Sequence, residues 1–62
     1  MPVGPPEGKV WLVVNGWAKD DLFEIDASTA EQEIAEAKAR FRKLYPSDPI
    51  MKVGHIRYQE PE

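Results

Sequence analysis

The first predicted strand is hydrophobic on both of its faces. It runs from about Lys9 to Asn15, where Val10, Leu12 and Val14 alternate with Trp11 and Val13. Each face of such a strand needs a covering layer, because an uncovered face leaves apolar side chains in water. The chain predicts one helix with one apolar stripe, so part of this apolar surface stays uncovered.

Two further stretches alternate between apolar and polar residues. A second strand is predicted at Leu22–Ala27, where Phe23, Ile25 and Ala27 share a face. A third is predicted at Ile50–Tyr58, with Met51, Val53 and His55 on one face and Ile56 and Tyr58 on the other. Gly54 lies where this alternation breaks, so we expect a β-bulge there.

Two turns compete to join the first two strands. Asn15-Gly16 is typical of a type I′ hairpin turn, but it would pair Leu12 with Lys19. A turn centred on Ala18-Lys19 instead pairs Leu12 with Ile25 and gathers apolar side chains on one face. Because register follows the pairing that buries one face, we expect the second turn.

A helix is predicted between Ser28 and Pro46. Ser28 and Glu31 have the spacing of a capping box, and Pro46 ends the helix because proline cannot donate into it. Acidic residues lie toward the start and basic residues toward the end, which complements the helix dipole. At helical spacing the apolar stripe consists of Ala30, Ile34, Ala37, Phe41, Leu44 and Tyr45.

These elements predict an α+β fold of order ββαβ. A right-handed crossover places the third strand beside the first, which gives a three-stranded antiparallel sheet of order 2-1-3 with the helix on one face. The expected core consists of Val10, Leu12, Val14, Phe23, Ile25, Ile34, Ala37, Phe41 and Leu44.

Composition divides the chain into one domain and two tails. Residues 1–8 are rich in proline and glycine and predict a flexible tail, residues 9–58 form the domain, and residues 59–62 predict a frayed end. With no cysteine, no signal-like start and no long apolar run, we expect a cytoplasmic protein that does not enter a membrane.

The residue types of catalysis do not gather in this sequence. Ser28 is used as a cap and Ser47 lies in a turn, so no nucleophile stands beside a base. His55 has no carboxylate partner in prospect, and no set of residues has the spacing of a zinc site. We therefore expect no enzyme activity, no cofactor and no metal.

The uncovered face of the sheet is the predicted partner-binding site. It consists of Trp11, Val13, Trp17 and Leu22, framed by Glu24 and Asp26. The expected occupant is a protein partner or a second copy of the chain. In the competing interpretation, the proline-rich start folds back and Pro5 or Pro6 covers Trp11.

A basic patch is the alternative site. Its expected members are Lys38, Arg42, Lys43, Lys52 and Arg57. Such a patch would suit an acidic partner or a nucleic-acid accessory role. Nucleic acid ranks below protein because the net charge is −3.

The run FEIDASTAEQEIAEAKARF, from Phe23 to Phe41, resembles small phage and mobile-element proteins of the DpnD/PcfM type. In those proteins an alternating strand closes on a small residue and is followed by a capped helix rich in Glu and Ala. The resemblance covers about a third of the chain and offers no site residues. It implies a non-catalytic accessory protein that regulates or inhibits a host protein.

Overall fold

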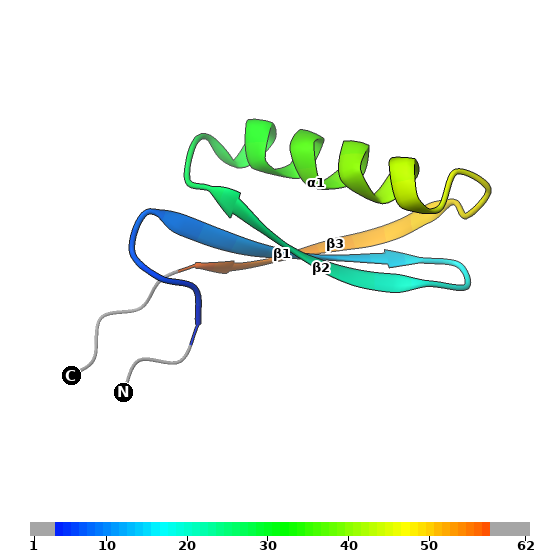
Figure 1. Ribbon diagram of the computed structural model, residues 1–62, viewed down its shortest axis with the longest axis horizontal. Coiled ribbons are helices and arrows are strands. Elements are labelled where there is room, and N and C mark those ends of the chain that lie inside the picture. The colour runs from blue at the N-terminus through cyan, green and yellow to red at the C-terminus, as the bar shows by residue number, and fades with distance from the viewer. Residues whose placement is uncertain (1–3, 58–62) are drawn as a thin grey trace.

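The computed structural model describes residues 4–57, so Tyr58 and both ends of the chain lie outside the described residues. Its elements are β1 (Lys9–Gly16), β2 (Asp20–Asp26), α1 (Ala30–Leu44) and β3 (Ile50–Arg57). The strands form an antiparallel sheet of order β2-β1-β3, and α1 lies across one face of it (Figure 1). This confirms the predicted α+β fold and strand order.

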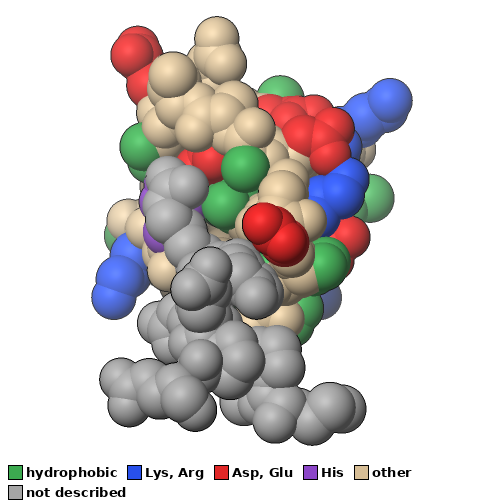
Figure 2. Space-filling view, turned by 90° about the vertical axis from the view of Figure 1, so that its left-hand side faces the viewer, with side chains coloured by type: hydrophobic (Ala, Val, Ile, Leu, Met, Phe, Trp, Pro, Cys, Tyr) green, Lys and Arg blue, Asp and Glu red, His purple; other side chains and the backbone are tan. Residues whose placement is uncertain are grey.

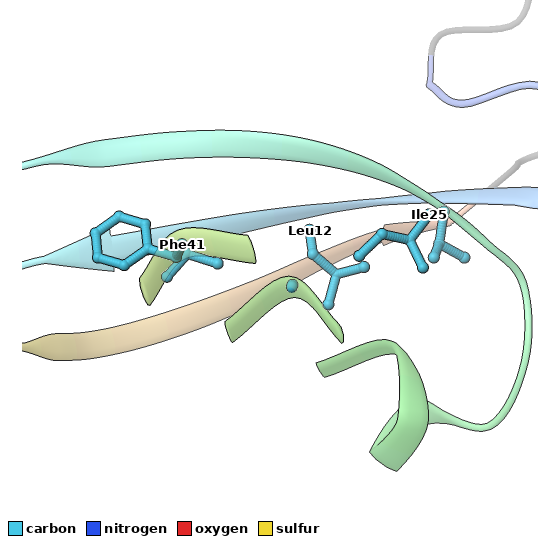
Figure 3. Packing of buried hydrophobic residues seen from close by; sticks show 6 residues of the cluster. Leu12, Ile25 and Phe41 are labelled. Carbon is cyan, nitrogen blue, oxygen red and sulfur yellow. The ribbon is translucent and has the colours of Figure 1, made fainter. Parts of the chain in front are cut away.

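The core lies between α1 and the inner face of the sheet. Leu12 of β1, Ile25 of β2 and Phe41 of α1 are spread along this layer (Figure 3). The other members of this buried cluster are Val10, Val14 and Ala37, and the partly buried apolar residues that pack against it include Phe23 and Ile34. The central strand therefore supplies half of the buried cluster, as its apolar pattern predicts.

The predicted apolar stripe of α1 is wrong at Ala30 and Leu44. Leu44 is 57% exposed and Ala30 is also exposed. The predicted Ala37 and Phe41 are buried together with Glu33, and these three positions are four residues apart and therefore form one line along the helix. Leu44 lies off this line. Tyr45 continues it, with its ring centroid 5.0 Å from that of Phe41.

The predicted hairpin register is wrong by two residues. Leu12 lies opposite Phe23 rather than Ile25, and the turn is centred on Trp17-Ala18. A shift of two keeps every side chain on its expected face, because side chains alternate with a period of two. The core residues of both strands therefore point inward as predicted, although their cross-strand partners differ.

Contacts from outside the hairpin add to its own hydrogen bonds at this turn. Within the hairpin, the Gly16 amide donates to the Lys19 carbonyl at 2.7 Å; from outside it, the Pro49 carbonyl accepts from the Trp17 amide at 3.0 Å. The Asp48 carboxylate accepts from the amides of Ala18 and Lys19 at 2.8–3.1 Å. The loop between α1 and β3 thus stabilises a turn that local sequence does not single out.

Position 16 requires glycine because other side chains approach its Cα closely, not because its backbone angle is unusual. A Cβ atom at this position would overlap the Asp48 carboxylate and lie 2.7 Å from Cζ of Phe41. The glycine therefore lets the end of β1 contact both the core and the anchoring loop.

The β-bulge of β3 lies at Met51, not at the predicted Gly54. Asn15 pairs with Lys52 and Gly16 with Ile50, so the residue between them is extra. Met51 is consequently exposed and does not share the inner face with Val53. Gly54 pairs regularly with Val13.

Thr29, not Ser28, caps the helix. The Thr29 hydroxyl oxygen accepts from the Gln32 amide at 3.2 Å. The Ser28 amide instead donates to Oε2 of Glu33 at 2.7 Å. The sequence offers the capping spacing twice, at Ser28 and again one residue later, and the contact with buried Glu33 fixes Ser28 before the cap.

Candidate binding surfaces

The face of the sheet opposite α1 carries a continuous apolar surface. Trp11 lies between Glu24 of β2 and Ile56 of β3, and Val13 lies between Leu22 and Gly54. Leu22 is 47% and Ile56 40% exposed, while Trp11 and Val13 are half-buried. We call this surface the outer face and define it by Trp11, Val13, Leu22, Gly54 and Ile56. Ile56 joins the residues that the sequence predicted for it.

Gly54 leaves a notch on the β3 side of the outer face. A Cβ atom added to Gly54 would meet no other atom within 4 Å. Val13, its partner on the central strand, is therefore uncovered on that side. A side chain from another molecule has room to contact Val13 there.

Polar contacts fix the two acidic residues that frame this face. The Trp11 indole donates from Nε1 to the Glu24 carboxylate at 3.1 Å. Lys9 donates to and forms an ion pair with Asp26. This hydrogen bond and charge pairing raise the pKa of Lys9 and lower the pKa of Asp26. The negative charge of Asp26 is thus paired with Lys9, and Glu24 is the carboxylate that contacts Trp11.

Residues 4–8 belong to the predicted tail and lie on the same side of the sheet as the outer face (Figure 1). The Lys9 amide donates to the Pro6 carbonyl at 3.1 Å, and the Ala27 amide donates to the Gly8 carbonyl at 2.9 Å. Pro5 is buried and Pro6 is exposed. These residues therefore border one end of the outer face, while Leu22 and Ile56 remain accessible.

Trp17 lies in a different place from the other predicted interface residues. It is 77% exposed at the hairpin turn and lines a groove of about 410 Å³. Tyr45, Pro46 and Pro49 line the same groove. The Tyr45 hydroxyl donates to the Asp21 carboxylate at 3.3 Å, and the negative charge of Asp21 raises the pKa of Tyr45.

The structure brings three residues of the predicted basic patch together. Lys38 and Arg42 line one hollow on α1, and Lys38 and Lys52 line an adjoining hollow between α1 and β3. Lys43 is exposed in the last turn of α1 and does not line either hollow. Arg57 pairs with Val10, at the opposite end of β3 from Ile50.

Glu33 and His55 form a buried polar contact that the sequence did not predict. Glu33 is fully buried, and its Oε1 lies 2.9 Å from Nε2 of His55. The second carboxylate oxygen accepts from the Ser28 amide. The position of Glu33, four residues before Ala37 and eight before Phe41, was the signal that it faces the sheet. The expectation that His55 lacks a carboxylate partner is therefore wrong.

This polar contact lies at the end of the molecule where α1 begins. At this end the histidine side chain reaches the surface, and acidic side chains are spread over the surface around it (Figure 2). Among residues 4–57, no group of three or more metal-ligating side chains is close enough to hold a metal ion. The described helix is also too short and too polar to cross a membrane.

Comparison with known proteins found no matching family model, no matching curated protein and no matching solved structure. The resemblance of Phe23–Phe41 to small phage proteins stays a prediction. Function has to be argued from the surfaces of this chain.

Proposed function

We propose that this chain is a small, non-catalytic protein-binding module that binds its partner through the outer face. The observation that carries the proposal is the position of α1, which covers only one face of the sheet. The opposite face keeps Trp11, Val13, Leu22 and Ile56 in a continuous surface. Contiguous apolar surface on a soluble domain is typical of a binding site.

Burial of this face supplies the free energy of association. Apolar surface contributes about 25 cal/mol for each Å² removed from water. Leu22 and Ile56 are about half exposed and can bury more area, and Gly54 leaves room for a partner side chain beside Val13. Tryptophan is also enriched among residues that dominate binding free energy.

Charge favours a partner with basic residues around an apolar projection. The charge of Asp26 is paired with Lys9, whereas the Glu24 carboxylate accepts from the Trp11 indole and forms no ion pair among the described residues. A cationic group of the partner would therefore meet Glu24 at the border of the outer face. Because such attraction is screened by ions, association should slow as salt rises.

The partner is a different protein or a second copy of this chain. Two copies related by a two-fold axis would bury the same face on each. The resemblance to phage accessory proteins supports a role in regulating or inhibiting a host protein. In either case the residues that bind are the same.

Nucleic acid is the alternative partner class, because Lys38, Arg42 and Lys52 line adjoining hollows. The net charge of −3 and the presence of Glu31 in one of these hollows favour protein instead. A salt-dependent mobility shift with DNA or RNA would support the alternative.

Two substitutions test the outer face without removing core residues. Leu22→Ser removes an exposed apolar side chain, and Gly54→Val fills the notch. Gly54→Val should raise the free energy of unfolding by about 0.5–1 kcal/mol, because valine suits a strand and glycine does not. Each variant should nevertheless weaken self-association or partner binding by more than about tenfold.

Leu44→Ser is the matched control, because Leu44 is an exposed apolar residue of α1 and lies outside the outer face. Self-association is measured by sedimentation equilibrium. A partner captured from the native source is purified, and its affinity for each variant is measured by calorimetry. Equal affinities for Leu22→Ser, Gly54→Val and Leu44→Ser would contradict the proposal, as would a monomer that captures nothing.

A further inference from the structure

A groove with an apolar floor and a basic rim runs between α1 and β3. A hollow of about 260 Å³ opens between the helix and the start of β3, and one of about 580 Å³ adjoins it along α1. Ile34 and Lys38 line both hollows, so the two are continuous. We call this the β3 groove and define it by Ile34, Met51, Val53, Lys38, Arg42 and Lys52.

The groove follows from the placement of the helix. α1 packs mainly over β1 and β2. The inner side of β3 is therefore only partly covered, and Val53 and Ile50 are half-buried at positions where a centred helix would bury them. Apolar surface on the side of β3 remains available to another molecule.

The backbone of β3 is open along its outer edge. The Gly16 amide bonds to the Lys19 carbonyl, and hydrogen-bonded pairs alternate along an antiparallel ladder. The even-numbered residues of β1 therefore bond to β2, and the odd-numbered residues bond to β3. It follows from the β1–β3 register that Val53 and His55 direct their N–H and C=O groups away from β1. No strand within residues 4–57 pairs with this edge.

The rim of the groove is positively charged. Lys38, Arg42 and Lys52 have no carboxylate partner in the described part of the chain. Glu31 is the acidic residue that lines the larger hollow. The groove therefore has an excess of positive charge next to unpaired backbone donors and acceptors.

We propose that the β3 groove binds, by strand addition to β3, an extended segment of a partner protein that carries both apolar and acidic side chains on one face. The backbone of the segment bonds to Val53 and His55. Because successive side chains of a strand point to opposite faces, every second side chain of the segment faces α1. Among these, apolar side chains cover Val53 and Ile34, and carboxylates meet Lys38 and Arg42.

This site goes beyond the outer face and has the opposite charge preference. The open strand edge favours a peptide over a nucleic acid, because a phosphate backbone offers no amide donors to the β3 carbonyls. The apolar floor favours a peptide as well. A chain with both surfaces can hold two different segments at once.

The probe for this site is a synthetic nine-residue peptide with capped ends, in which Val and Glu take turns at the odd-numbered positions and Thr fills the even-numbered ones. On binding, the Val53 and His55 amides should become at least about tenfold more protected from hydrogen exchange, because they gain strand partners. The Lys38→Glu/Arg42→Glu double variant should lose at least about tenfold in affinity for the peptide, measured by NMR titration.

Lys19→Glu/Lys43→Glu is the matched control, because it changes the net charge equally and its residues lie outside the β3 groove. This control and Gly54→Val should bind the peptide like the parent, which separates this site from the outer face. Equal weakening in both double variants would overturn the proposal. So would protection of amides elsewhere than β3, or equally tight binding of a single-stranded oligothymidine.

Discussion

Glu33 fixes the start of α1 against the sheet through both of its carboxylate oxygens. One lies 2.9 Å from the His55 ring, and the other accepts from the Ser28 amide at 2.7 Å. Burying a carboxylate is costly unless hydrogen bonds replace those that it made with water. Glu33 has no exposed surface. Its contacts to β3 and to the residue before the cap therefore offset its desolvation.

Glu33→Ala should lower the free energy of unfolding by about 1–3 kcal/mol, because it leaves the Ser28 amide and the His55 ring without this partner. Glu33→Gln keeps an oxygen that can accept from Ser28 and should lose less. Urea denaturation monitored by circular dichroism measures both. Equal stability of Glu33→Ala and the parent would mean that the buried carboxylate stabilises nothing.

The apolar stripe left out Glu33, although its spacing from Ala37 and Phe41 fits the buried line, because glutamate is usually a surface residue. Phe41 and Ala37 were predicted correctly because both are apolar. Leu44 was predicted wrongly for the same reason. The line that is buried is set by how the helix sits on the sheet, which depends on contacts between residues that are far apart in the chain.

At the scale of elements, hydrophobic pattern predicted the strands and the helix well, and their ends less well. The apolar run of β1, the alternation of β2 and Pro46 after α1 each indicate one element. The cap is ambiguous, since Ser28 and Thr29 each have a Glu or Gln three residues later. In the structure Thr29 is the cap, because the hydrogen bond from the Ser28 amide to Glu33 holds Ser28 before the helix start.

Thr29→Ala should lower the free energy of unfolding by about 1 kcal/mol, because the Gln32 amide loses its acceptor at the helix start. Ser28→Ala keeps the backbone amide that bonds to Glu33 and should cost less than half as much. Thermal unfolding of both variants compares them directly. A greater loss in Ser28→Ala would show that Ser28 is the cap in solution.

At the scale of the whole molecule, the loop between α1 and β3 decides the pairing of β1 and β2. Apolar pairing favoured a turn at Ala18-Lys19 over one at Asn15-Gly16, and the structure has neither of these two turns. The register in the structure pairs Val14 with Asp21, which local pairing disfavours. This pairing is tolerated because the Asp21 carboxylate accepts a hydrogen bond from the hydroxyl of Tyr45, which lies at the end of α1.

The two binding surfaces also depend on the whole molecule. The residues of the outer face follow from strand alternation, so most of them could be predicted. Ile56 and the notch at Gly54 required the β1–β3 register. The β3 groove could not be predicted from sequence, because it depends on the position of α1 over β1 and β2. Lys38, Arg42 and Lys52 were already expected in the basic patch, and the fold places all three along this groove.

Asp48 is the residue through which this long-range selection of register can be tested. Its carboxylate accepts from the amides of Ala18 and Lys19, and the Pro49 carbonyl beside it accepts from Trp17. Asp48→Ala removes the side-chain acceptors and should lower the free energy of unfolding by about 1–2 kcal/mol. The hydrogen-exchange rates of the Ala18 and Lys19 amides should be higher than in the parent. The exchange rates of the central-strand amides should change only as much as the free energy of global unfolding does.

Asp20→Ala is the control, since Asp20 is an exposed carboxylate at the same turn. If Asp20→Ala accelerates exchange at Ala18 and Lys19 as much as Asp48→Ala does, the turn is held by its own residues and the loop does not select the register.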